Sequence, residues 1–236
     1  MADVLQHEQV VLVASSAEWS ALLEVLDIKE RAEYPFGSFF FYPVLQDTSQ
    51  KVLFIHIGWG KISSAAATQY VIDRWAPKEI IAIGTCGGIN GKVNVGDILL
   101  VNRTEVYDLS VSIGDPVEEK LFYRTNLTHA IEKIATQKHY LIQPMYSADR
   151  DLRPEDIIHI VQDGGVAADW ESAAIAFVAG RNAIPCLIIK YVSDLVDIVD
   201  GGELYSTDNT VFEERCAMAM KRLYDVLTDL LPRLAF

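Results

Sequence analysis

The chain has no long hydrophobic run. None of the unbroken apolar stretches in its 236 residues approaches the roughly 20 residues that a membrane-spanning helix needs. The short apolar run near the start also lacks the preceding basic residues of a secretory signal. We therefore expect a cytoplasmic protein with no membrane partner.

Cysteine is scarce, and histidine shows no metal-binding pattern. The three cysteines, Cys86, Cys186 and Cys216, are an odd number at wide spacing. This indicates buried free thiols in a reducing compartment rather than disulfide bonds. The five histidines form no HxxxH or HExxH pattern, and there is no CxxC motif. We therefore expect neither a metal site nor a cofactor.

Positive charge is also scarce. Lys and Arg number 20 against 33 Asp and Glu, so the net charge is −13. The basic residues form no cluster, which argues against a nucleic-acid partner, because nucleic-acid phosphates are bound by clustered Lys and Arg. Half of the residues are apolar, which excludes an intrinsically disordered chain. The composition leaves open a small-molecule ligand in a pocket.

Short apolar runs alternate along the chain with helical patterns. The runs are typical of buried strands and are Val10–Ala14, Lys51–Ile57, Glu79–Ile83, Asp97–Val101, Leu141–Tyr146 and Pro185–Val192. The helical patterns are Ala17–Lys29, Ser63–Trp75, Asn126–Gln137, Arg153–Gln162, Glu171–Arg181 and Thr207–Leu231. This alternation predicts one α/β domain over residues 1–236 with a largely parallel sheet.

Two segments carry more specific expectations. Phe36–Val44 is typical of an antiparallel hairpin arm that leads into the next strand. In Thr207–Leu231, apolar residues recur at helical spacing and are expected to face the core; they are Val211, Phe212, Cys216, Met218, Ala219, Leu223, Val226, Leu227 and Leu230.

The residues that follow the predicted strands are candidates for a site, because ligands of open α/β sheets bind beyond the carboxyl ends of the strands. Glu18 follows the first strand, in a helical turn where a carboxylate also suits the helix dipole. The glycine-rich loop Gly84–Gly88 follows the third strand, and its backbone can approach a ligand closely. It is not a GxGxxG motif and no helix follows it, so a dinucleotide site is disfavoured.

Acidic residues also stand at two further positions of this kind. Glu171 begins a helix, and Asp194 follows the last strand directly after Ser193. Each of them alone fits ordinary helix-capping chemistry. Together with Glu18, they place three carboxylates around one glycine-rich loop. Paired carboxylates of this kind serve acid–base chemistry at glycosidic bonds.

The combination of motifs resembles the methylthioadenosine/S-adenosylhomocysteine nucleosidases of the nucleoside phosphorylase superfamily. The motifs are Glu18 after the first strand, GTCGG at 84–88, VGD at 95–97, DWESAAIAFVA at 169–179 and SDLVD at 193–197. GTCGG, Lys190 and SDLVD are most similar to the plant-type members. The resemblance covers about residues 9–230. It implies a homodimer and a three-layer α/β sandwich around a mixed, partly closed sheet.

The resemblance also implies an activity, which is hydrolysis of the N-ribosidic bond of purine nucleosides. The expected substrates are 5′-modified adenosines, with methylthioadenosine first and S-adenosylhomocysteine and 5′-deoxyadenosine as alternatives. Glu18 matches the general base that activates water, and Asp194 matches the acid that protonates the purine at nitrogen-7. Glu171 matches the carboxylate that holds the ribose hydroxyls. The other residues expected to contact substrate are Thr85, Cys86, Gly87, Leu152, Trp170 and Ser193.

Two other functions stay open. A purine nucleoside phosphorylase needs fixed cations for phosphate, but Ala82 and the segment 15–18 stand where the superfamily's phosphorylases carry arginines. A phosphate site would then have to come from Arg103, Arg124 or Arg150. A noncatalytic nucleoside-binding protein would not need all three carboxylates.

The sequence departs from the family near the expected substrate. Trp170 replaces a methionine, and its indole is expected to stack on the base or sugar, to narrow the 5′ pocket, or to pack in the core. Arg150 and Asp151 stand in the segment that frames the purine, where an apolar or aromatic residue is usual. Tyr107 replaces a histidine before Asp108. These departures leave the preferred base and 5′ substituent undecided.

Overall fold

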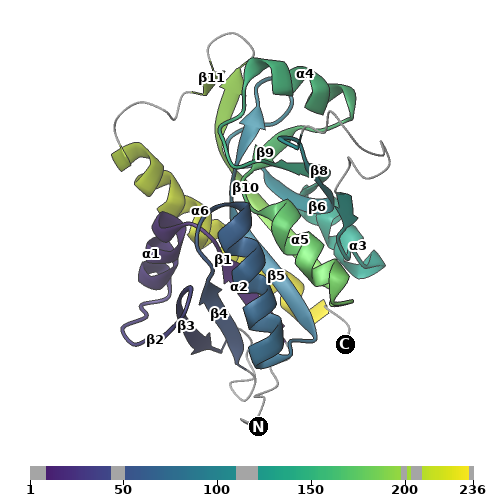
Figure 1. The fold of residues 1–236 in the computed structure, drawn as a ribbon. Coiled ribbons are helices and arrows are strands. Elements are labelled where there is room, and N and C mark those ends of the chain that lie inside the picture. The colour runs from purple at the N-terminus through teal and green to yellow at the C-terminus, as the bar shows by residue number, and fades with distance from the viewer. Residues whose placement is uncertain (1–8, 44–50, 110–121, 198–200, 203–208, 234–236) are drawn as a thin grey trace.

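The computed structural model describes residues 9–43, 51–109, 122–197, 201–202 and 209–233 (Figure 1). The strands are β1 (Gln9–Val13), β2 (Ala32–Tyr34), β3 (Gly37–Tyr42), β4 (Val52–His56), β5 (Glu79–Ile89), β6 (Ile98–Val106), β7 (Phe122–Arg124), β8 (Leu141–Ser147), β9 (Ala167–Asp169), β10 (Cys186–Asp197) and β11 (Gly201–Gly202). The helices are α1 (Ser16–Val25), α2 (Gly60–Trp75), α3 (His129–Lys138), α4 (Pro154–Gln162), α5 (Ser172–Arg181) and α6 (Asn209–Leu230), followed by a 3₁₀ turn at Leu231–Arg233.

The described strands form one eleven-stranded sheet that is partly closed. Its order is β11-β10-β6-β8-β9-β5-β1-β4-β3-β2, with β7 beside β6. Pairing of β10 with β5 closes β5, β9, β8, β6 and β10 into a ring. The mixed, partly closed sheet implied by the resemblance is therefore confirmed.

The largely parallel sheet expected from the alternation of elements is only partly right. β1 pairs in parallel with β4 and β5, and β5 pairs in parallel with β10. However, β10 runs antiparallel to β6, and β9 runs antiparallel to β5. The expected hairpin arm is confirmed, because β3 is antiparallel to both β2 and β4. Strands of two or three residues, such as β9 and β11, are too short to show a periodic pattern.

The sheet is buried on both faces. Along β1, Val11 and Val13 belong to one core cluster, while Val10 and Leu12 belong to the other. Successive strand residues point to opposite faces, so this division shows one layer on each side. The first core contains residues of α1, α3 and α6, and the second contains residues of α2 and α5. Figure 1 shows α2 and α5 in front of the sheet and α6 behind it, which confirms the three-layer sandwich.

Two predictions about local structure are wrong. Val211 and Met218 of α6 are 37% and 59% exposed, whereas the predicted Ala219 and the unpredicted Met220 are fully buried. The segment Gly84–Gly88 is not a loop but part of β5, which continues to Ile89. A Cβ at Gly88 would lie 2.5 Å from Val93 and 2.7 Å from Val192, so the glycine here permits close packing inside the ring.

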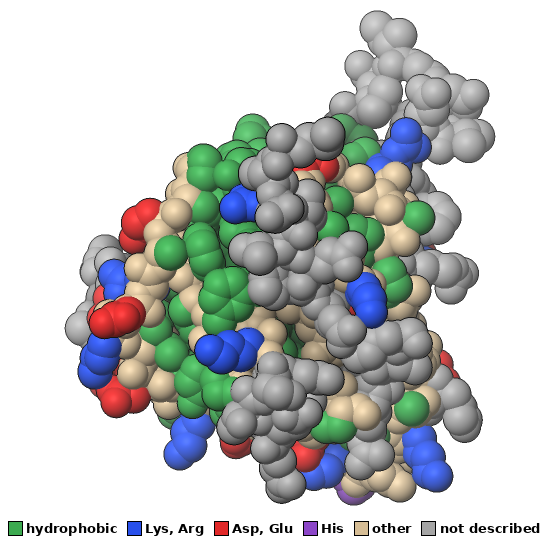
Figure 2. Space-filling view, turned by 90° about the horizontal axis from the view of Figure 1, so that it is seen from below, with side chains coloured by type: hydrophobic (Ala, Val, Ile, Leu, Met, Phe, Trp, Pro, Cys, Tyr) green, Lys and Arg blue, Asp and Glu red, His purple; other side chains and the backbone are tan. Residues whose placement is uncertain are grey.

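The described residues show where the scarce residue types of the chain lie. The three cysteines are buried and free, as predicted. None of the described helices is both long enough and apolar enough to cross a bilayer. In the same part of the chain, no three His, Cys, Asp or Glu residues are grouped so that they could hold a metal ion. On the face seen in Figure 2, Lys and Arg side chains are scattered singly among hydrophobic ones.

Candidate active site

A cavity of about 370 Å³ is lined by residues at the carboxyl ends of β1, β5 and β10 and at the start of α5. All nine residues predicted to act on substrate line it, and they are Glu18, Thr85, Cys86, Gly87, Leu152, Trp170, Glu171, Ser193 and Asp194. Positions up to 176 residues apart along the chain therefore meet in one place. This is the arrangement expected for a ligand site at strand ends.

Glu18 has two structural connections. As the third residue of α1, it completes a capping box, in which its Oε2 accepts from the backbone N–H of Ser15 at 3.2 Å. Its Oε1 accepts from the backbone N–H of Thr85 at 2.5 Å and from the Thr85 hydroxyl at 2.7 Å. The capping role considered from sequence is thus present, but the same carboxylate also reaches β5. These contacts fix a buried hydrogen-bond acceptor at one end of the cavity.

Lys190 of β10 lies beneath this end and is 3% exposed. Its Nζ is 2.8 Å from Oδ2 of Asp169. Burial lowers the pKa of Lys190, but the carboxylates of Asp169, Glu171 and Glu18 outweigh burial and raise it above its usual value. The ammonium therefore stays charged and offsets the nearby acidic groups. A Cβ at Gly84 would lie 3.1 Å from Oε1 of Glu18 and 3.2 Å from Nζ of Lys190, so a larger residue would push these two groups aside by a few tenths of an ångström.

Glu171 lies at the N-cap of α5, and its side chain is directed toward a second helix. Its Oε1 accepts from the backbone N–H of Gly60, the first residue of α2, at 3.0 Å. Burial raises the pKa of Glu171 to about 8, against the opposing effect of Lys190. A carboxyl group in this state can both accept from and donate to the hydroxyls of a bound sugar.

Asp194 lies farther along β5 than Glu18, because a Cβ at Gly87 would lie 3.4 Å from its Oδ2, whereas Glu18 lies beside Gly84. Asp194 is 4% exposed and marks the other end of the cavity. Burial raises its pKa above the usual value for an aspartate, and the hydrogen bond from Ser193 opposes the rise. The Ser193 hydroxyl lies 2.7 Å from Oδ1 of Asp194 and 3.3 Å from the carbonyl oxygen of Cys86. When Asp194 is protonated, the hydroxyl can accept from it and donate to Cys86. The surroundings of Asp194 therefore suit a proton donor.

Two tryptophans stack at the wall of the cavity. The Trp59 and Trp170 rings are 5.3 Å apart at 15°, and Trp59 is 65% exposed. An open hollow of about 350 Å³ adjoins them, lined by Trp59, Gly60, Ile62, Asp149 and Trp170. Trp170 thus lies in a wall shared by both spaces and is not a core residue. The alternative of a core position is wrong, while the predicted contact of Trp170 with substrate stays a prediction.

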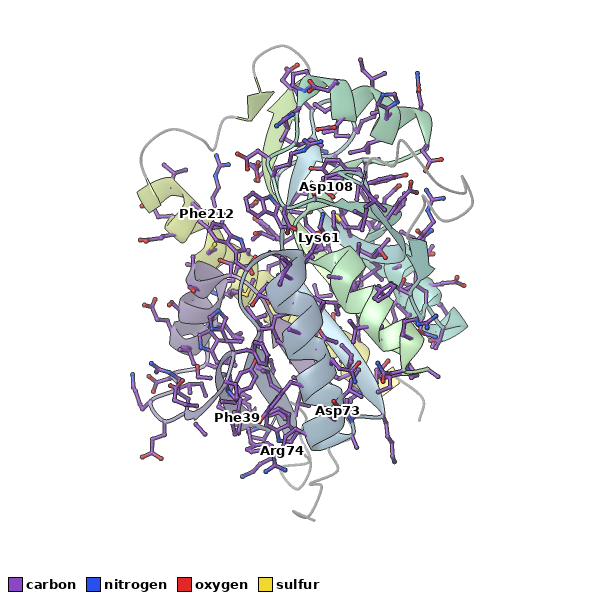
Figure 3. All side chains as sticks on the ribbon, viewed as in Figure 1. Phe39, Lys61, Asp73, Arg74, Asp108 and Phe212 are labelled. Atoms are coloured by element: carbon purple, nitrogen blue, oxygen red, sulfur yellow. The ribbon has the colours of Figure 1, made fainter. Side chains whose placement is uncertain are left out.

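The loop before α4 is held in place by contacts of Arg150 that lie outside the cavity. The guanidinium of Arg150 binds both carboxylate oxygens of Asp156, at 2.5 and 2.8 Å, and lies 5.2 Å from the centre of the Tyr107 ring. Asp151 and Leu152, the next residues, are left to line the cavity. Close by, Lys61 of α2 binds Asp108, which follows the end of β6 (Figure 3). Arg150 therefore holds the loop that frames the pocket and does not enter it.

Of the other arginines considered for a phosphate site, Arg103 is held in an ion pair away from the cavity. Arg103 binds Asp163 at 2.7 Å and the Tyr146 hydroxyl at 2.9 Å. The Arg124 side chain lies outside the described part of the structure. Among the described residues that line the cavity, none is Lys, Arg or His. These described lining residues would offer a phosphate dianion no cation to contact.

Sequence reasoning missed several lining residues. They are Ser15, Trp59, Ala168, Asp169, Val196 and Phe212. Phe212 belongs to the apolar stripe of α6 and packs partly against the core, so its pattern carried no separate signal. Trp59 directly follows Gly58, beyond a predicted strand, and that position was the available signal.

Comparison with known proteins identifies the family to which this chain belongs. The family model described as the phosphorylase superfamily matches residues 8–232. The chain belongs to this superfamily. A curated 5′-methylthioadenosine/S-adenosylhomocysteine nucleosidase of Buchnera aphidicola is 30% identical over 167 residues, which are 63% of this chain and 69% of that protein. This relative places the superfamily member among the nucleosidases, as the motifs predicted.

Solved structures agree with this at the level of fold. The Campylobacter jejuni 5′-methylthioadenosine/S-adenosyl homocysteine nucleosidase matches with a TM-score of 0.77 and 19% identity, over 97% of this chain and all of that chain. The Arabidopsis thaliana 5′-methylthioadenosine nucleosidase matches with a TM-score of 0.76 and 21% identity, over 97% and 96%. The bacterial and plant structures thus match this superfamily member equally well, and the plant-type affinity of its motifs stays a prediction.

Proposed function

We propose that this nucleosidase hydrolyses the N-ribosidic bond of 5′-modified adenosines to adenine and a free sugar. Methylthioadenosine is the leading substrate, and S-adenosylhomocysteine and 5′-deoxyadenosine are the alternatives. The observation that carries the proposal is the placement of Glu18 and Asp194 in one cavity with opposed surroundings. The 30% identical relative, which is named for methylthioadenosine and S-adenosylhomocysteine, supports the same substrate class.

The proposed reaction divides the proton transfers between the two ends of the cavity. Asp194 gives its proton to nitrogen-7 of the purine, so that the bond from C1′ to nitrogen-9 breaks and a neutral base leaves. A water molecule adds to C1′, where oxocarbenium character has developed, and Glu18 takes the proton from that water. Glu171 binds the ribose hydroxyls beside them. Each acid or base contribution is typically about 100- to 10,000-fold in rate.

Water is favoured over phosphate as the nucleophile. A phosphorylase holds a dianion with fixed cations, whereas the described lining of this cavity is acidic and neutral. Lys190 is already bound to Asp169 and shares its charge with Glu18 and Glu171. The comparisons favour neither the phosphorylase nor the noncatalytic binding protein.

The test is base release from methylthioadenosine, S-adenosylhomocysteine, 5′-deoxyadenosine, adenosine and inosine, with and without phosphate. Chromatography of both products identifies the sugar. We expect adenine and free sugar without phosphate, with the 5′-modified adenosines cleaved fastest. A sugar phosphate that forms only with phosphate would overturn the choice of water. No release from any member would favour the binding protein.

Two further properties are proposed alongside the activity. We propose a homodimer, in which a second copy covers the apolar start of α2, where Trp59 is 65% and Ile62 is 85% exposed. Sedimentation equilibrium tests it, and Ile62→Glu is expected to favour monomers. We also propose a cytoplasmic location, which accords with three buried, free thiols. Fractionation of cells that express the chain tests the location.

A further inference from the structure

Arg215 connects α6 to the base end of the cavity. Its Nη1 donates to the carbonyl oxygen of Ser193 at 2.8 Å. Phe212 lies one turn earlier on the same side of the helix and lines the cavity. The first turns of α6 therefore contact the site twice, once through a wall residue and once through the backbone next to Asp194. Nothing in the sequence pattern singles out Arg215, which lies outside the apolar stripe.

The carbonyl that Arg215 binds belongs to a bulge in β10. Val192 pairs with Cys86, and Asp194 pairs with Gly87, so Ser193 is one extra residue with no register partner on β5. A bulge leaves the extra residue outside the strand ladder and redirects the neighbouring side chains. A buried carbonyl without a ladder partner needs another donor. Arg215 supplies that donor and thereby holds the backbone from which Asp194 projects.

Among the described residues, the charges that act on Asp194 come from different elements. Arg215 of α6 lowers its pKa, whereas Asp151, in the loop before α4, raises it in addition to the larger effect of burial. From β5 it faces the neutral Cys86, whose thiol pKa is raised by burial. The other charged residues that line the cavity in the described part of the chain, Glu18, Asp169 and Glu171, lie with Lys190 at the other end. Among these groups, Arg215 is the cation that acts on Asp194.

We propose that Arg215 is a positioning residue for base release: it binds the Ser193 carbonyl, fixes the bulge in β10, and so aims the Asp194 carboxyl at the purine. The inference rests on the proposed function, because it takes Asp194 as the proton donor. Misplacing a reacting group by about 1 Å can cost roughly 100-fold in rate. Arg215 itself exchanges no proton with the substrate.

The test compares Arg215→Met and Arg215→Lys with the matched control Arg222→Met. Arg222 is exposed on the same helix and lies over the Tyr140 ring at 5.9 Å, away from the cavity. For Arg215→Met we expect kcat to fall about 10- to 100-fold with little change in KM. We also expect the alkaline limb of the kcat profile to move to higher pH, because Asp194 loses a neighbouring cation. Arg215→Lys keeps the charge, so the alkaline limb stays and part of kcat returns.

A structural role alone would lower the melting temperature of Arg215→Met and leave kcat and the alkaline limb at wild-type values, which would overturn the inference. If Arg215→Met does not fold, Arg215→Lys decides: a reduced kcat supports the inference, and a wild-type kcat overturns it. Carboxyl ¹³C NMR, with the Asp194 signal assigned through Asp194→Asn, gives a readout without turnover. The pH at the midpoint of the Asp194 titration is expected to rise in Arg215→Met. A wild-type protein that cleaves no nucleoside would overturn the proposed function instead.

Discussion

The two ends of the cavity hold the same kind of side chain in different electrostatic surroundings. At the sugar end, Glu18, Asp169 and Glu171 share one buried ammonium, that of Lys190. At the base end, Asp194 has a serine hydroxyl, burial and the more distant Arg215. The first arrangement places a buried cation beside three carboxyl groups, whereas in the second burial raises the pKa of Asp194 and favours its protonated form. A fold can thus obtain a base and an acid from two carboxylates by distributing cations unequally.

The largest expected effect comes from removing the acid at the base end. Asp194→Asn keeps the shape of the side chain but has no proton to give, so we expect base release to fall about 10,000-fold. Binding of methylthioadenosine, measured by calorimetry, is expected to persist. Asp197→Asn, on the same strand but outside the cavity lining, is the control. Full activity in Asp194→Asn would remove Asp194 from the mechanism.

The second effect comes from the sugar end. Glu18→Gln cannot take a proton from water, and we expect kcat to fall about 1,000-fold. The smaller loss reflects the reactivity of an oxocarbenium-like centre toward water even without a base. Glu24→Gln, exposed on the same helix, should leave kcat unchanged. An unchanged rate in Glu18→Gln would show that another group activates the water.

Removing the shared cation tests the comparison directly. Lys190→Met leaves buried carboxylates without their partner, and loss of one partner of a buried ion pair costs about 3–5 kcal/mol of unfolding free energy. Denaturant unfolding measures this loss, with the exposed Lys138→Met as control. Because the remaining carboxyls then favour their protonated forms, the loss should be larger at pH 8 than at pH 5. A loss independent of pH would contradict the shared-charge interpretation.

The smallest effect concerns Glu171, whose pKa is raised to about 8. The folded state binds its proton more tightly than the unfolded state does. Its stabilising contribution is therefore complete below the unfolded pKa of about 4.5 and is lost as pH rises through about 8. Glu171→Gln carries no such charge, so we expect its melting temperature to exceed that of wild type by about 2–4 °C at pH 9. Melting curves from pH 5 to pH 9 test this.

The advantage of Glu171→Gln should shrink toward pH 5, while sugar binding weakens at every pH. Glu155→Gln, exposed on α4, serves as the control with no expected shift. A variant less stable than wild type at pH 9 would show that Glu171 acts as a partner of Lys190 more than as a buried carboxyl.

Much of the site was predictable because its residues stand at the ends of strands that the sequence pattern locates. Glu18, Thr85 and Asp194 follow short apolar runs that are typical of strands. Their order along the chain matches the order of the motifs in a known family, and all three line the cavity. Arg215 and Phe212 were not predictable in this way. Both lie on a helix whose apolar spacing describes packing alone, and only its crossing over β10 brings them to Ser193 and the cavity.

The amino-acid sequence by itself determined the alternation of strands and helices, the buried faces of the sheet and the identity of the acidic residues at the strand ends. These follow from local spacing and from which side chains avoid water. The closed ring of β5, β9, β8, β6 and β10, the bulge at Ser193 and the sharing of Lys190 among three carboxylates were decided by tertiary structure. They depend on distances between residues far apart in the chain, and those distances decide which carboxyl groups share a cation.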